Sequence, residues 1–173
     1  MSGLHETDIR SDARFLEDLA RDEFSLDVVS GDRPFKQLDD LLYLLVRKEK
    51  NPGILAYLAH AFTACYGERL VSDIGGRWGE TAEDGLQIEY IGGRRSLKLM
   101  KLCSARMLRM GATLPVSAES DAALRLFADA YPDDVQSFET LYDALKREHD
   151  AGGWRLTDAG WTIISTPERI AHG

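Results

Sequence analysis

Cysteine is scarce in this sequence of 173 residues, and the scarcity excludes several architectures. Cys65 and Cys103 stand alone, each within an apolar helical pattern, so there is neither a disulfide framework nor a Cys-x-x-Cys metal motif. We expect two buried thiols in a cytosolic protein. Histidine is also sparse and forms no His-x-x-x-His or His/Cys cluster, which predicts that no metal is bound; its positions are His5, His60, His149 and His172.

The sequence also lacks a long apolar run. Its longest uncharged stretch, residues 51–67, is too short and too polar to span a bilayer. The opening residues, 1–6, show neither the basic region nor the apolar core that a secretory signal needs. Because 44% of the residues are nevertheless apolar and 9% are aromatic, a folded globular chain is indicated. We expect a cytoplasmic protein that does not contact membranes.

Known catalytic motifs are absent as well. There is no G-x-G-x-x-G, no P-loop and no G-x-S-x-G elbow, so the sequence predicts no cofactor and points to no particular reaction. One polar site stands out, where Gly67 interrupts a long helical pattern and suggests close approach of another backbone. The candidate residues of a buried polar site are His60, Glu68 and Arg77. An enzyme that uses Glu68 with His60 is one functional interpretation of the sequence, and two others follow from its charges below.

The periodicity of apolar residues predicts a mostly helical α+β fold. Helices are expected over residues 8–21, 34–50, 52–74, 96–110, 118–130 and 137–150. The helix over 52–74 is apolar nearly all round, which is typical of the buried centre of a domain. Strands and a second hairpin are expected over residues 24–29, 77–81, 86–91 and 153–164.

These elements suit one domain over residues 1–173, in which residues 1–23 form a peripheral N-terminal helix. The two β-hairpins could join in one small antiparallel sheet. The sequence gives no indication of the oligomeric state.

Charge is distributed unevenly along the chain. The sequence carries 29 acidic and 21 basic residues, a net charge of −8. No acid lies between Tyr90 and Ala118, but six bases do: Arg94, Arg95, Lys98, Lys101, Arg106 and Arg109. On a helical wheel these bases lie opposite the leucine and methionine residues, which predicts a cationic face on the helix 96–110. The other 15 bases stand against all 29 acids, a balance of −14.

The cationic face has several interpretations. It could bind an anion or phosphate, contact nucleic acid or dock an acidic partner, or its bases could pair with the protein's own acidic helices. Binding of nucleic acid is disfavoured, because no aromatic side chain that could stack on bases lies on this face. It stays one of the alternatives. The run 152–160 resembles the end of a winged helix, but the preceding helix carries acids that phosphates would repel: Glu139, Asp143, Glu148 and Asp150.

Short motifs between residues 24 and 110 carry a family resemblance. A strand pair follows the last of these motifs, which are Leu26-Asp27, Leu38-Asp39, Gly67-Glu68 and Gly76-Arg77-Trp78. Together they resemble an uncharacterised bacterial domain family, a domain of unknown function found in short soluble proteins. The resemblance implies an α+β fold and supplies no activity.

The first functional interpretation is a non-catalytic cytosolic bacterial protein-binding domain, similar to immunity or adaptor proteins. Its acidic surface would engage a basic protein partner, and the candidate contact residues are Asp133, Asp134 and Glu139. The alternative is a small anion-, nucleotide- or nucleic-acid-binding protein that uses the cationic face of the helix 96–110.

Overall fold

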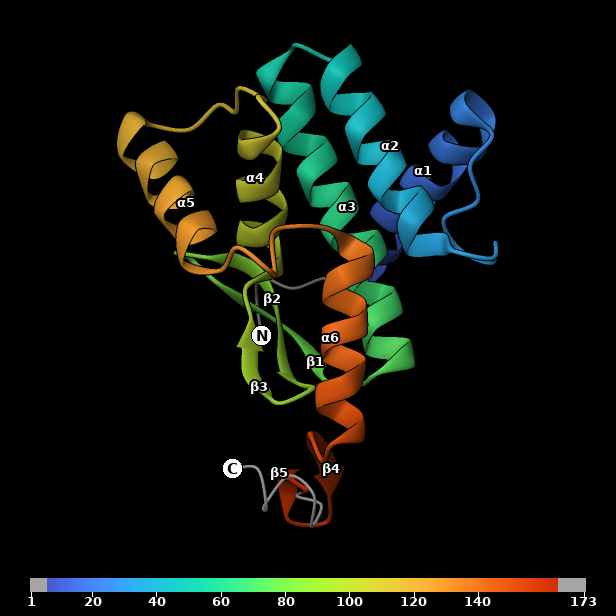
Figure 1. The fold of residues 1–173 in the computed structure, drawn as a ribbon, viewed down its shortest axis with the longest axis vertical. Helices are drawn as coiled ribbons and strands as arrows, with labels where there is room; N and C mark the ends of the chain where they lie inside the picture. The colour runs from blue at the N-terminus through green and yellow to red at the C-terminus, as the bar shows by residue number, and fades with distance from the viewer. Residues whose placement is uncertain (1–5, 165–173) are drawn as a thin grey trace.

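The computed structural model describes residues 6–164 and shows six helices and five strands in that span (Figure 1). The helices are α1 (Glu6–Phe24), α2 (Pro34–Lys48), α3 (Pro52–Asp73), α4 (Leu99–Arg109), α5 (Ala118–Ala130) and α6 (Phe138–Asp150). The strands are β1 (Arg77–Thr81), β2 (Gly85–Ile91), β3 (Arg94–Leu97), β4 (Trp154–Thr157) and β5 (Gly160–Ile163). The predicted class, a mostly helical α+β fold, is confirmed.

Helix α3 forms the centre of the fold, between α1 on one side and α4 on another (Figure 1). The side chain of Asn51 accepts two hydrogen bonds from N–H groups of the first turn and fixes where the helix begins. Phe62 and Tyr66 are completely buried. The Tyr66 hydroxyl donates to the backbone oxygen of Phe138 at 2.7 Å and thereby ties α3 to α6. The predicted buried centre is confirmed over residues 58–70, whereas Ile54 and Tyr57 near the start of the helix are exposed.

Helix α1 packs along α3 through one apolar stripe. Ile9, Ala13, Leu16 and Ala20 recur at helical spacing and are all buried in the same core as α3. Of the predicted N-terminal helix, residues 1–5 lie outside the described residues. Across residues 6–164, no helix combines the length and the apolar character needed to cross a membrane.

Strands β1, β2 and β3 form an antiparallel sheet in that order. Strand β3 corrects the expected helix 96–110, because Arg94–Leu97 is extended and pairs with β2, and α4 begins only at Leu99. The reason is the two-residue Gly92-Gly93 connection, in which Gly92 has a φ of +59°. A two-residue glycine turn between two extended segments is a hairpin signal. Gly92-Gly93 is therefore the feature of the sequence that indicates a strand at β3.

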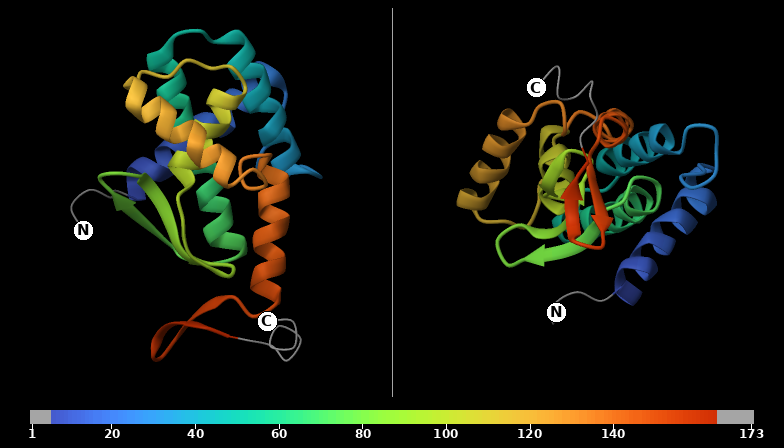
Figure 2. Two further views of the ribbon diagram at one scale, coloured as in Figure 1. Left: turned by 60° about the vertical axis from the view of Figure 1, so that its left-hand side comes forward. Right: turned by 90° about the horizontal axis from the view of Figure 1, so that it is seen from below.

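Strands β4 and β5 form a separate two-stranded sheet at the end of α6 (Figures 1 and 2). The two hairpins therefore do not join in one sheet within the described residues. A backbone hydrogen bond links the two hairpins instead, in which the backbone N–H of Trp154 donates to the Gly92 oxygen at 2.7 Å. The Tyr90 ring also packs against Trp154 and Trp161, at centroid distances of 5.0 and 5.4 Å.

The segment 24–29 is not a strand, which corrects the prediction. Phe24 is the last residue of α1, and Ser25 has a φ of +55°, which turns the chain. The Asp27 carboxylate then accepts hydrogen bonds from the N–H groups of Val29 and Ser30, both at 2.9 Å. These bonds lower the pKa of Asp27 and satisfy the backbone in a turn without a partner strand.

Candidate functional site

The six bases of the cationic segment do not lie on one helix. Arg94 and Arg95 belong to β3, Lys98 lies between β3 and α4, and the other three belong to α4. The predicted cationic face of a single helix is therefore wrong. The bases divide among several contacts, and most of these contacts are with the protein's own acids.

Arg94 joins β3 to α6 and to the loop before it. Its guanidinium lies 2.6 Å from an Asp134 carboxylate oxygen and 2.9 Å from one of Glu148. Burial alone would lower the pKa of Arg94, but the hydrogen bonds to Glu148 and Asp134 outweigh it and raise the pKa. Glu148 also accepts a hydrogen bond from the Gly93 N–H at 3.0 Å. With two carboxylates at hand, Arg94 has little capacity for an external anion.

Asp84, at the turn between β1 and β2, carries one negative charge that two lysines share. Its side chain is only 10% exposed, and its oxygens lie 3.3 Å from Lys98 Nζ and 3.4 Å from Lys101 Nζ. The Lys101 ammonium also lies 5.1 Å from the centre of the Phe127 ring. This turn acid thus compensates part of the positive charge at the start of α4.

Arg106 forms the most buried ion pair, with Asp39 on α2 at 2.6 Å; the two side chains are 12% and 13% exposed. The other contacts of Asp39 are with the N-terminus of α6, where it accepts hydrogen bonds from the N–H groups of Phe138 and Glu139 at 2.7 and 3.2 Å. Burial raises the pKa of Asp39, and this exceeds the lowering by Arg106 and the two N–H groups. The pair therefore joins three helices.

Two bases have no acidic partner within residues 6–164. The Arg95 guanidinium lies 5.7 Å from the Trp154 ring centre. Arg109 is exposed and lines a cavity of about 620 Å³ between α2, α4 and the 131–137 loop, which it shares with Asp133. These two bases have no carboxylate partner in the described residues, whereas Lys98 and Lys101 share a single one.

The three acids predicted to contact a partner differ in whether they are already paired within the molecule. Asp134 pairs with Arg94, and Glu139 accepts a hydrogen bond from the Arg33 Nε at 3.0 Å. That bond lowers the pKa of Glu139. Asp133 is exposed and has no ion pair in the described part of the chain.

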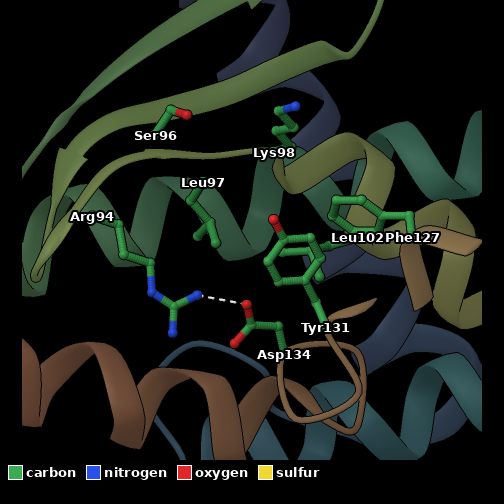
Figure 3. A pocket seen from close by; sticks show the side chains of 8 residues that line it. All are labelled: Arg94, Ser96, Leu97, Lys98, Leu102, Phe127, Tyr131 and Asp134. Carbon is green, nitrogen blue, oxygen red and sulfur yellow. Dashed lines mark hydrogen bonds and ion pairs between the residues drawn. The ribbon is translucent and has the colours of Figure 1, made fainter. Parts of the chain in front are cut away.

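A cavity of about 450 Å³ lies between β3, α4 and the C-terminal end of α5 (Figure 3). Figure 3 shows the Tyr131 ring and the Leu97 side chain on opposite sides of the space, with the Arg94–Asp134 ion pair at one end. Lys98 lies at the other end. The volume is in the range of small-molecule sites.

A third opening, of about 460 Å³, lies between the β1–β2 turn, α4 and the first half of α5. Its apolar lining comes from Met100, Val116 and Leu124, and Glu83 and Glu119 contribute carboxylates without an ion pair in the described residues. The paired side chains of Asp84 and Lys101 also line it. We call this opening the acidic groove and define it by Met100, Val116, Leu124, Glu83 and Glu119.

His60, Glu68 and Arg77 each have a different partner. His60 Nδ1 lies 2.9 Å from an Asp12 carboxylate oxygen, Glu68 accepts a hydrogen bond from the Trp78 indole at 2.9 Å, and Arg77 pairs with Glu89 at 2.8 Å. His60 and Glu68 are eight residues apart on α3, about 12 Å along its axis. The structure does not bring the three together in one pocket.

The close neighbour that requires glycine at residue 67 is a side chain, whereas the sequence suggested close approach of another backbone. A methyl group at this position would lie 2.0 Å from the Cη2 atom of Trp78. The Trp78 indole lies directly on α3 and donates to Glu68 one residue further on. The two motifs, Gly67-Glu68 and Gly76-Arg77-Trp78, therefore contribute to the same packing contact between α3 and β1.

Both cysteines are buried free thiols, as predicted. Burial raises the pKa of Cys65 to about 12 and that of Cys103 to about 11, so neither forms a thiolate nucleophile at neutral pH. No group of three or more histidine, cysteine or acidic side chains in residues 6–164 is arranged to hold a metal ion.

Comparison with protein-family models, with curated proteins and with solved structures gave no match. The resemblance to a bacterial family of unknown function stays a prediction.

Proposed function

We propose that the protein is a non-catalytic cytosolic binding domain whose acidic surface engages a basic partner protein, as immunity and adaptor proteins do. The internal pairing of the cationic segment is the observation that carries this proposal: four of its bases have acidic partners within the molecule, namely Arg94, Lys98, Lys101 and Arg106. Exposed acids without an ion pair within residues 6–164 include Glu80, Glu83, Glu119, Asp129, Asp133, Asp143 and Asp158.

The consequence is electrostatic. Acids that have no internal counter-charge attract basic proteins and speed their association, while paired bases offer little to an anionic partner. Of the three acids that the sequence suggested, Asp133 alone is unpaired in the described span, because Asp134 and Glu139 already contact arginines. The contact surface should therefore be sought among the unpaired acids.

The test uses a fluorescently labelled synthetic helix of about 18 residues with lysines on one face and leucines on the other. We expect saturable one-to-one binding by anisotropy at about 0.15 M salt, weakening as salt rises to about 0.5 M. A glutamate–leucine peptide of the same pattern serves as the control and should not bind. Equal binding of the two peptides, or no saturable binding of the basic one, would overturn the proposed function.

A second candidate function, binding of a small anion such as a nucleotide, is favoured by the cavity in Figure 3. Its lining includes the Lys98 side chain, which is 43% exposed, and the Tyr131 ring. A ligand of the folded state raises the melting temperature. This candidate predicts a shift of a few degrees with millimolar nucleotide or inorganic phosphate that Lys98→Gln abolishes; an unchanged melting curve for the wild-type protein would discard it.

A further inference from the structure

We infer that the acidic groove is where the partner docks, and that the docked segment is basic and amphipathic. The inference rests on the proposed function and names its contact surface. The walls of the groove come from distant parts of the chain, the β1–β2 turn and the first half of α5, and α4 forms its floor. Figure 2 shows the tip of the β1–β2 hairpin reaching toward the N-terminal end of α5 in both views.

The groove combines apolar surface with two polar side chains, Lys101 and Ser104, which α4 contributes to its floor beside Met100. Val116 is 40% exposed, and Met100 and Leu124 are partly buried against the core below. In α5, Ala128 is the one fully buried residue, and Leu124 and Phe127 are partly buried against the core. An accessible apolar strip with a polar rim is typical of protein interaction sites.

The rim of the groove determines the sign of the partner's charge. Glu83 on the turn and Glu119 on the first turn of α5 are exposed, and neither has an ion pair in the described residues. Asp84 between them is already compensated by Lys98 and Lys101. Uncompensated negative charge therefore stands on both walls, so that lysines or arginines flanking an apolar stripe would match the groove and an anionic membrane surface would be repelled.

Charge reversal at the rim tests the assignment with the lysine–leucine peptide as the probe. We expect Glu83→Lys/Glu119→Lys to weaken binding about tenfold or more. The matched control, Asp129→Lys/Asp143→Lys, changes the net charge equally at exposed acids that do not line the groove, and should change binding less than about twofold. Because a lysine at residue 119 opposes the helix dipole, Glu83→Gln/Glu119→Gln is measured in parallel and should weaken binding about threefold.

A charge-neutral variant separates docking from general attraction. Val116→Gln removes apolar contact at an exposed position and should weaken peptide binding about threefold with no change in salt dependence. If the groove variants and the control lose affinity equally, the groove assignment is overturned, while the proposed function still stands on the wild-type binding. Concentration-dependent dimerisation that the groove variants abolish would assign the groove to a second copy of the chain and likewise overturn the inference.

Discussion

Replacing Asp39 with alanine is expected to lower the free energy of unfolding by about 3–5 kcal/mol, because the Arg106 guanidinium is then left buried without a counter-charge. The same change removes the acceptor for two N–H groups at the start of α6. Chemical denaturation followed by circular dichroism measures the effect.

The neighbouring acid provides the control for this prediction. Asp40 pairs with Lys36 at 2.8 Å, but both side chains are almost half exposed, so Asp40→Ala should change stability by less than about 1 kcal/mol. The double variant Asp39→Ala/Arg106→Met removes the stranded charge and should recover part of the loss. If Asp39→Ala is no more destabilising than Asp40→Ala, the buried pair does not hold α2, α4 and α6 together.

Gly67→Ala is expected to destabilise the protein by about 2–3 kcal/mol, although alanine is the better helix former by about 1 kcal/mol. The added methyl group would meet the Trp78 ring at 2.0 Å, within a helix whose surroundings are fully packed. Displacement of the ring should also alter tryptophan fluorescence, because the Trp78 indole loses its hydrogen bond to Glu68. Thermal and chemical unfolding with fluorescence detection measures both.

Gly53→Ala on the same helix is the control for that experiment. Its methyl group would meet only the Asn51 side chain, at 3.3 Å, so a change below about 0.5 kcal/mol is expected. In a Trp78→Leu background Gly67→Ala should become nearly neutral, because the clash is gone. Equal destabilisation in both backgrounds would show that Trp78 is not the reason for the glycine.

Local chemistry made much of the fold predictable. Ser117 and Ser137 each cap a helix through a side-chain oxygen, and the Asn51 cap fixes the start of α3. The segment Arg77–Thr81 was predicted with its observed bounds, because the turn at Gly85 marks the hairpin. The Arg-Arg-Ser-Leu sequence of β3 has no strand pattern of its own and is extended by pairing with β2, so the Gly92-Gly93 turn is its signal in the sequence.

The site was less predictable, because it depends on contacts between distant segments. Lys98, Lys101 and Arg106 share a helical spacing, and this suggested one cationic face. Their partners, Asp84 and Asp39, lie far away in sequence, and no spacing rule relates them to α4. The acidic groove has the same origin, since its walls are more than 30 residues apart and meet only when α5 folds back over α4.

The most direct test of the central claim is an NMR titration of the protein labelled at its methionine methyl groups. Met100 lines the acidic groove and its Sδ lies 3.4 Å from the Thr63 hydroxyl on α3, whereas Met110 lines the separate cavity beside Arg109. The account predicts that the lysine–leucine peptide shifts the Met100 signal saturably and leaves Met110 unchanged. Saturable binding that shifts Met110 and not Met100, or identical shifts with the glutamate–leucine peptide, would contradict it.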